Sequence, residues 1–317
     1  MKQFTIKISL FSLFLIILLS ACGGGDSNKK ANNNGEKYTL EYKLAKGDTF
    51  KQNVATDMNM SQEAMGQQIE IGIKMNMGMH YDVIDVQDSS IALEMKFDEM
   101  KMSMTSPMGA IEYDSNTTEE YATLQDMGPM FKAIIGIPVE IIVDKTGDVK
   151  SAKGFEKLAD AMIVSLSNNF DASTKEQMVT QFGEQFSEES IKSMLNASGN
   201  LPDKPVAIGD KWNINMSTKN GNIEMIVNME MVLKSVENNV ATIEGEGSLG
   251  TDEPVIQDAN GMEVKITMKG TQKSIVKIDM NTGQTISAVV DQNVTGESEV
   301  MGMKVPMKMK IKTTITN

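Results

Sequence analysis

The stretch IEIGIKMNMGMHYDV, residues 69–83, places an apolar side chain at every second position. Successive side chains of a β-strand point to opposite faces of its sheet, so this alternation predicts a half-buried strand. The odd-numbered face begins with isoleucines and continues with Met75, Met77 and Met79. His80, the single histidine of the chain, falls on the opposite face. The methionines are therefore expected to replace aliphatic residues on a buried face.

Two further stretches repeat this alternation. IEMIVNMEMVL, residues 223–233, and VMGMKVPMKMKIKTTI, residues 300–315, each carry methionine at alternate positions. Their expected buried faces contain Met225, Met229 and Met231 in the first and Met303, Met307 and Met309 in the second. Pro306 lies on the polar face of the second stretch, and because proline has no N–H it predicts an edge position or a bulge.

The stretch IALEMKFDEMKMSM, residues 91–104, changes phase along its length. Its apolar residues are odd-numbered up to Phe97 and even-numbered from Met100, which also places Met102 on the buried face. One extra residue near Asp98 and Glu99 would produce this shift, as a β-bulge does.

The centre of the chain has a helical pattern instead. Phe155, Leu158, Met162, Leu166 and Phe170 follow one another at intervals of three or four residues, which indicates an amphipathic helix. Downstream, Ser173 and Glu176 form a capping-box pattern, and SEESIKSMLNAS, residues 187–198, predicts a further short helix. Two prolines in GNLPDKPV, residues 199–206, end this helical block.

Short motifs recur on either side of the helical block. KGDTF, residues 46–50, and IGDKW, residues 208–212, both place Gly-Asp-x-aromatic at the start of a strand region. Thr-Gly turns follow in VEIIVDKTGDVKSA and SIVKIDMNTGQTISAV, and the spacing implies about 26 additional residues in the first copy, near LQDMGPMFKAIIG. The predicted class is α+β and mainly β, with two similar curved antiparallel sheets or open barrels and a helical segment between them. The expected boundaries are residues 37–153, 154–200 and 201–317.

The N-terminus has the pattern of a secretory signal. Lys2 and Lys7 accompany an apolar run, residues 8–19, that is too short to span a bilayer. Small residues precede Cys22, the single cysteine, and the match resembles the bacterial lipobox, in which this cysteine is lipidated. Residues 1–21 are therefore expected to be a lipoprotein signal peptide and residues 22–36 a flexible tether. By resemblance to known sorting rules, Gly23 favours the outer membrane, and both its periplasmic face and the cell surface remain open.

Composition argues against several classes of function. The formal net charge is −13 and all 30 basic residues are lysines. The chain therefore lacks arginine, whose planar guanidinium group binds phosphate through two parallel hydrogen bonds. Nucleic acid is therefore not an expected partner. One histidine, one cysteine and no arginine also exclude most catalytic triads and histidine-based metal sites, so neither an enzyme nor a cofactor is expected.

Several motifs together resemble a known family. The lipobox, YKLAKGDTF, IEYDS, VDKTGDVKSAKG and LPDKPVAIGDKW occur in the order seen in an uncharacterised family of Bacteroidota cell-envelope lipoproteins. The likeness extends from about Tyr38 onward. It implies a β-rich protein anchored in the envelope by its N-terminal lipid, and it implies no established activity.

Three hypotheses of function follow. The first is non-catalytic binding of an apolar ligand or lipid on a concave sheet face lined by Met75, Met77, Met79, Met102, Met225, Met229, Met231, Met303, Met307 and Met309. The second is a structural or protein-interaction module with a filled core. The third is Cu(I) binding, because thioethers are soft ligands. Alternate strand residues lie ~6.5–7 Å apart, too far for neighbours on one strand to share an ion, so no metal site is assigned.

Overall fold

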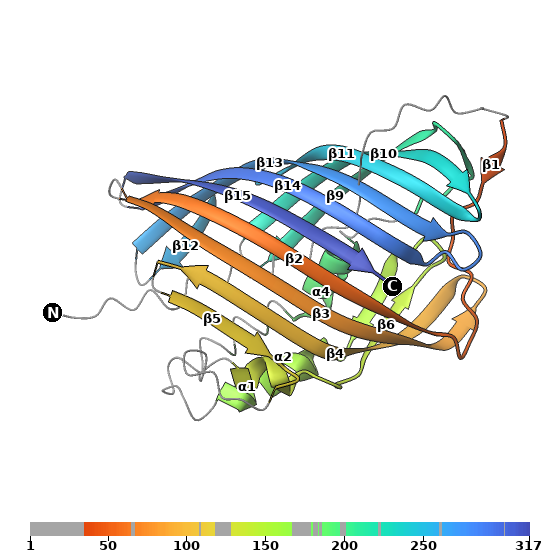
Figure 1. Cartoon of the computed structure of the whole chain (residues 1–317), viewed down its shortest axis with the longest axis horizontal. Coiled ribbons are helices and arrows are strands. Elements are labelled where there is room, and N and C mark those ends of the chain that lie inside the picture. Colours follow the sequence, from red (N-terminus) through yellow and green to blue (C-terminus); the bar gives the residue numbers. More distant parts are fainter. Residues whose placement is uncertain are drawn as a thin grey trace.

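The computed structural model describes residues 35–64, 67–107, 109–117, 128–166, 179, 183, 186–196, 201–220, 223–259, 262–300 and 302–317. This part of the chain forms one large curved sheet, a short two-stranded ribbon and three helices (Figure 1). The expected signal peptide, Cys22 and most of the tether lie outside the described residues, as do Phe170, Ser173 and Glu176.

The main sheet has thirteen strands and the pairings between them are antiparallel. Along the sheet their order is β7-β6-β4-β3-β2-β15-β14-β13-β11-β10-β9, with β5 beside β4 and β12 beside β13. The strands are β2 (Thr49–Ala64), β3 (Gln67–Gln87), β4 (Ser90–Ser106), β5 (Gly109–Asp114), β6 (Val139–Val143), β7 (Val149–Lys153), β9 (Lys211–Asn220), β10 (Ile223–Glu237), β11 (Val240–Gly250), β12 (Val255–Ala259), β13 (Met262–Asp279), β14 (Thr285–Val300) and β15 (Met303–Thr316). The mainly β, antiparallel class is thus confirmed.

The two β-rich halves are continuous with each other. Strand β15 pairs with β2, so that Met309 lies opposite Met60 and Ile311 opposite Met58. The last strand of the second half therefore joins the first long strand of the first half. Along this order the terminal strands are β7 and β9, which flank the helical block in sequence, while β5 and β12 each pair with a single strand.

The first motif pair has the same backbone geometry in both halves. Gly47 and Gly209 have φ angles of 93° and 94°, a region that glycine enters without steric cost. The N–H of Gly47 donates to the Val83 carbonyl at 2.9 Å, and that of Gly209 donates to the Leu233 carbonyl at 2.7 Å. These equivalent contacts support an internal repeat.

The second motif pair also matches. Gly147 and Gly283 have positive φ angles, and their N–H groups donate to the carbonyls of Asp144 and Asp279. One N-terminal segment contacts both turns, because the Tyr42 N–H donates to Lys145 and the Lys43 N–H to Thr282, each at 2.8 Å. The segment therefore ties the equivalent turns of the two halves together.

The extra residues of the first half lie between β5 and β6. Both strands pair with β4, and the 115–138 segment between them contains α1 (Gly128–Ala133). In the second half, β13 runs without interruption alongside β11. Strands β5 and β6 together thus occupy the place beside β4 that β13 alone occupies beside β11. The described part of the expected insertion, which includes α1, lies between β5 and β6.

Two local irregularities match their sequence signals. Gly78 lies opposite Glu99 and Met79 opposite Phe97, which leaves Asp98 as an extra residue and confirms the predicted bulge. Pro306 pairs with β14, whereas pairing of β15 with β2 begins only at Met307. The proline therefore sits where β15 is locally an edge.

Helix α4 (Glu188–Asn196) bridges the two edges of the sheet. It packs against both β7 and β9, while α2 (Phe155–Leu166) packs against α1. The Asn196 side chain accepts from the Val149 N–H at 2.6 Å and donates to the Val149 carbonyl at 3.3 Å. On the other edge, the Ser193 hydroxyl donates to the Ser217 carbonyl at 3.0 Å. These contacts satisfy edge groups that would otherwise be open to pairing with another chain.

A diagonal line of glycines crosses the second half where neighbouring strands approach closely. A Cβ on Gly270 would lie 2.4 Å from the Asn293 carbonyl oxygen, and one on Gly247 only 1.9 Å from that of Asn228. Because these obstacles are backbone atoms, no side-chain rotation removes them. The close approach of the neighbouring backbone therefore requires residues without a side chain at these positions.

We expect Gly270→Ala to destabilise the fold by about 1–3 kcal/mol, the usual range for overpacking. Gly72→Ala is the matched control, because its Cβ would meet only side-chain atoms, the Thr105 hydroxyl at 2.7 Å and the Asn59 Oδ1 at 3.7 Å, and the hydroxyl can rotate away. Urea unfolding followed by circular dichroism measures both. Equal losses for the two variants would contradict the proposed backbone obstacle.

Glu188 links α4 to β7 through its carboxylate. It accepts from the Ser151 hydroxyl at 2.7 Å and from the Ala152 N–H at 3.2 Å, and these bonds, that of Ser151 first, hold the pKa of Glu188 below its ordinary value. A lowered pKa stabilises the fold above the unfolded value of about 4.3, and this contribution disappears as the pH falls through the folded value.

We therefore expect the protection of the Ala152 amide, that is its exchange rate relative to the intrinsic rate at the same pH, to fall in acid, and Glu188→Gln to remove most of that pH dependence. Glu189→Gln, in the same exposed first turn, is the control and should leave it intact. Hydrogen exchange measured across the acid range tests this. If the protection of Ala152 depended on pH identically in all three proteins, the link between α4 and β7 through Glu188 would be contradicted.

Candidate functional site: the methionine-lined interior face

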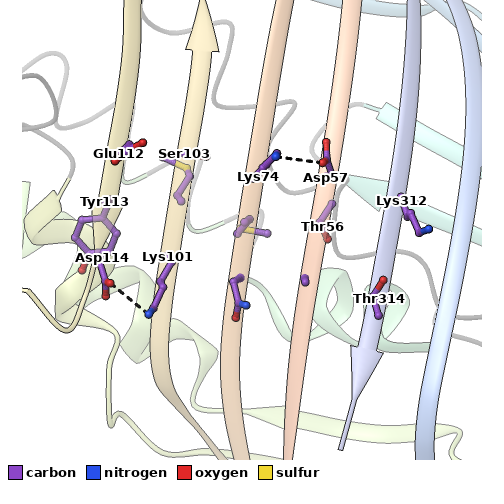
Figure 2. Close-up of a pocket in the computed structure, with 14 residues that line it drawn as sticks. Thr56, Asp57, Lys74, Lys101, Ser103, Glu112, Tyr113, Asp114, Lys312 and Thr314 are labelled. Carbon is purple, nitrogen blue, oxygen red and sulfur yellow. Dashed lines mark ion pairs between the residues drawn. The ribbon is translucent and has the colours of Figure 1, made fainter.

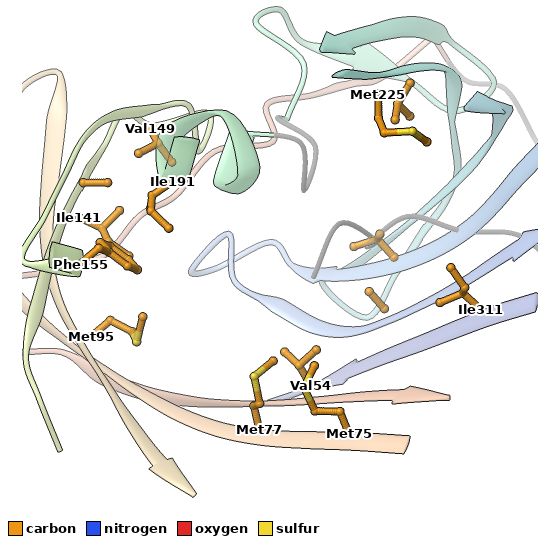
Figure 3. Packing of buried hydrophobic residues seen from close by; sticks show 14 of the residues in the cluster. Val54, Met75, Met77, Met95, Ile141, Val149, Phe155, Ile191, Met225 and Ile311 are labelled. Atoms are coloured by element: carbon orange, nitrogen blue, oxygen red, sulfur yellow. The ribbon is translucent and has the colours of Figure 1, made fainter. Parts of the chain in front are cut away.

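Most of the methionines expected on one face are buried. Met75, Met77, Met102, Met225, Met229, Met231, Met307 and Met309 are all buried, and Met79 is half-buried. Labelled side chains from both halves, such as Met77 and Met225, point into the space that the curved sheet surrounds (Figure 3). We call this surface the interior face.

Met303 differs from the expectation, since 59% of it is exposed. It is the first residue of β15 and pairs only with Val300 of β14. On its other side, the pairing with β2 among the described residues begins only at Met307. The alternation of apolar residues predicted that Met303 is buried. Alternation does not show, however, at which residue the neighbouring strand β2 starts to pair with β15.

The interior face contains further methionines that the proposed lining did not include. Met58 and Met60 come from β2, Met95 and Met100 from β4, and Met268 from β13, and all are buried. The same period-two pattern marks them in the sequence. Strands ordinarily favour β-branched and aromatic residues, so this many unbranched thioethers make an interior face of flexible side chains.

His80 is engaged on the opposite face of the sheet. Its Nδ1 lies 2.5 Å from the Asp98 carboxylate, whose other oxygen is 3.5 Å from the Lys51 ammonium group. The imidazole is thus separated from the interior thioethers by the sheet itself. Within the described ranges, no group of three or more His, Cys, Asp or Glu side chains is placed to hold a metal ion.

A few polar side chains interrupt the apolar interior. Thr56 and Thr313 are hydrogen bonded to each other at 3.2 Å, and Gln292 donates to Gln272 at 2.8 Å. These buried pairs satisfy each other, which is the usual arrangement in an apolar core.

Three other interior polar atoms lack such partners. The Ser274 hydroxyl, the Tyr113 hydroxyl and the Trp212 Nε1 are buried and have no hydrogen-bond partner among the described residues. Loss of water around the phenol raises the pKa of Tyr113 to about 12, with a smaller contribution from the charge of Asp114. The sequence carried no signal for these atoms, because partner choice depends on strand register.

A charged groove of about 520 Å³ lies along β2, β3, β4 and β5 (Figure 2), and its lining combines charged residues of the opposite face with four residues assigned above to the interior face, Thr56, Met75, Met102 and Tyr113. Its charges are largely paired, with Lys74 3.8 Å from Asp57 and Lys101 3.3 Å from Asp114. Such exposed pairs are each worth little energy. The groove is lined by Ala55, Thr56, Asp57, Lys74, Met75, Asn76, Lys101, Met102, Ser103, Glu112, Tyr113, Asp114, Lys312 and Thr314.

Comparison with known proteins identifies the family. Residues 88–285 match the family of unknown function DUF6263. The chain belongs to this family. The match covers the first half from the end of β3 and most of the second half, and it assigns no activity. No curated protein matches the chain.

Solved structures show only weak likenesses. A structure titled "Lipid-protein interactions in lipovitellin" is 8% identical with a TM-score of 0.45, and the match covers 85% of this chain but only 25% of that chain. An outer membrane channel from Pseudomonas putida F1 is 8% identical, with a TM-score of 0.23 and coverage of 91% and 100%. The translocator domain of autotransporter NalP from Neisseria meningitidis is 6% identical, with a TM-score of 0.21 and coverage of 87% and 90%. Likenesses of this strength identify no function.

No helix among the described residues is long and apolar enough to cross a membrane.

We expect Met231→Ala to cost about 2–5 kcal/mol, the range for truncating a buried methionine, because the native side chain is only 1% exposed. Met303→Ala removes the same atoms from an exposed site and should change stability by less than ~0.5 kcal/mol. Thermal and urea unfolding provide the comparison. A similar loss in both variants would show that the two positions do not differ in burial.

Proposed function

We propose that this chain is a lipoprotein of the outer membrane in Bacteroidota, and that it binds an acyl chain or similar apolar ligand on its interior face without catalysing a reaction. The observation that carries the binding proposal is the interior face itself. It is formed by strands from both halves of one sheet, and buried methionines recur along it. Flexible, polarizable thioethers accommodate varied apolar partners better than branched side chains do.

The anchor supports the same proposal. A lipidated Cys22 followed by a tether of Gly, Asn, Ser and Lys would hold the folded part close to the membrane while leaving it free to turn. Membrane lipids would then be the most abundant apolar molecules within reach. Binding of one such molecule needs no histidine or arginine, consistent with the composition.

A filled structural module is the competing function, and the burial of several interior residues favours it. Met58, Met231 and Leu233 are between 0% and 1% exposed, as side chains packed on all sides would be. On this alternative, the partner surface lies elsewhere and no ligand enters the interior. The two functions differ in whether an apolar probe reaches Trp212.

The first experiment tests anchoring. Cells that express the full chain and are fed labelled palmitate should incorporate the label into the protein, and Cys22→Ser should abolish it. Ser20→Ala leaves small residues before the cysteine and is the control, with labelling retained. Labelling that persists in Cys22→Ser would refute lipidation at this residue.

The second experiment tests binding with the only tryptophan of the chain. Trp212 lies opposite the buried Met231, on the interior face. Heavy bromine atoms quench indole fluorescence on contact, so dibrominated stearic acid should quench Trp212 saturably in the full-length, detergent-solubilised protein. Unbrominated stearic acid should compete and restore the signal. Quenching that rises linearly without saturation or competition would favour the filled module.

A further inference from the structure

The face opposite the interior carries an excess of lysine on three neighbouring strands. Strands β13, β14 and β15 lie side by side in the sheet (Figure 1). Within residues 263–277, 287–299 and 304–312, the side chains that point away from the interior include eight exposed lysines: Lys265, Lys269, Lys273, Lys277, Lys304, Lys308, Lys310 and Lys312. The same faces carry four acidic residues: Glu263, Asp291, Glu297 and Glu299. This surface, which we call the basic band, therefore has a local charge of +4 in a chain of net charge −13.

Ion pairs account for only three of the eight lysines. These pairs are Lys265–Glu263, Lys273–Glu246 and Lys304–Glu297, at 3.4, 3.0 and 2.6 Å. The other five make no ion pair with any described residue: Lys269, Lys277, Lys308, Lys310 and Lys312. The fold thus leaves most of the positive charge of the basic band without a carboxylate partner.

The centre of the basic band has neutral neighbours across the strands. Lys269 lies opposite Thr295, which lies opposite Lys308, and Asn293 lies opposite Lys310. Lys308 and Lys310 are two residues apart on one strand, about 7 Å, so their ammonium groups repel each other. An anion from outside the chain would offset this repulsion, and the neighbouring hydroxyl and amide groups can donate hydrogen bonds to its oxygens.

The basic band lies on a convex surface. The sheet curves around its interior (Figure 3), so the opposite face bulges outward. Three strands span about 10 Å between the outer two, and the lysines of β15 extend from Lys304 to Lys312, about 26 Å at the rise of a strand. Small ligands are held in concave pockets, whereas a convex band of this size fits a partner that is extended and flat.

From this charge and shape we infer that the basic band docks on a membrane surface that carries anionic lipid headgroups, with β13, β14 and β15 lying along that surface. A lysine close to an anionic membrane increases the binding constant about fivefold, and five lysines of the band are unpaired. The inference relies on the proposed anchor for proximity, because the tether of residues 22–36 extends at most about 50 Å. Docking then determines which face of the protein turns toward the membrane, which a flexible tether alone does not.

The test measures how fast single lysines are acetylated by a reagent that does not cross membranes. The full-length protein, purified from the envelope with its native N-terminus, is mixed with excess vesicles of phosphatidylcholine, either alone or in an equimolar mixture with phosphatidylglycerol. Peptide mass spectrometry reports each site. We expect acetylation of Lys269, Lys308 and Lys310 to be about fivefold slower on the anionic vesicles. This protection should vanish in 1 M salt, where charges are screened beyond about 3 Å. Lys153 and Lys157, exposed on β7 and α2, are internal controls and should not change.

A triple variant, Lys269→Gln with Lys308→Gln and Lys310→Gln, should lose the protection of the other lysines in the band. Removal of three lysines is expected to lower the docking constant about a hundredfold. The matched control makes the same charge change away from the band, at three exposed lysines: Lys153, Lys157 and Lys204. None of the six lysines makes an ion pair with a described residue, so both variants should keep the urea midpoint of the unmodified protein.

The outcomes separate docking from anchoring. Protection of the band on anionic vesicles, lost in the triple variant and kept in the control, supports the inference. Equal acetylation on both vesicles, or equal loss of protection in both variants, overturns it. Protection by soluble dextran sulfate but not by anionic vesicles also overturns it and favours an acidic polysaccharide as the partner. Flotation with the phosphatidylcholine vesicles reports the anchor separately, because a protein that fails to float there but is protected on anionic vesicles lacks the anchor and still docks.

Discussion

The pairing of β2 with β15 is the contact on which the rest of the fold depends. It aligns residues 53–62 with residues 307–316 and joins the two halves into one sheet. Thr56 and Thr313, which are hydrogen bonded across it, are 257 residues apart in sequence. Closing a loop of that length costs about 5 kcal/mol by the logarithmic dependence of closure entropy on length. Burial of apolar side chains such as Met58 and Met309, at about 1.5–3 kcal/mol each, offsets this cost.

The same pairing explains why the interior face exists as one surface. Each half alone would present its own row of methionines and isoleucines to water. Once β15 lies beside β2, the two faces merge, and the terminal strands of the sheet, β7 and β9, are both contacted by α4. Helix α4 can contact both strands because its polar side chains form hydrogen bonds with their backbones. Asn196 bonds to β7 and Ser193 bonds to β9. Helix α4 thus links the two terminal strands of the sheet.

Local features of the fold could be predicted because their causes are local. The phase change at Asp98 marks a bulge in any sheet, and the methionine alternation selects one buried face. The repeated Gly-Asp motifs adopt the same turn because glycine at Gly47 and Gly209 permits the same positive φ. Non-local features were beyond such patterns. Nothing near β15 in the sequence specifies β2 as its partner, and the exposure of Met303 follows from where that partnership begins.

The most direct measurement is native mass spectrometry of the full-length protein extracted from the envelope. The interior-face account predicts a mass above that of the chain with its covalent anchor, and the excess should disappear on collisional activation as a released acyl lipid. A single species carrying only the covalent anchor, from preparations that retain loosely bound lipid in a control lipid-binding protein, would contradict it.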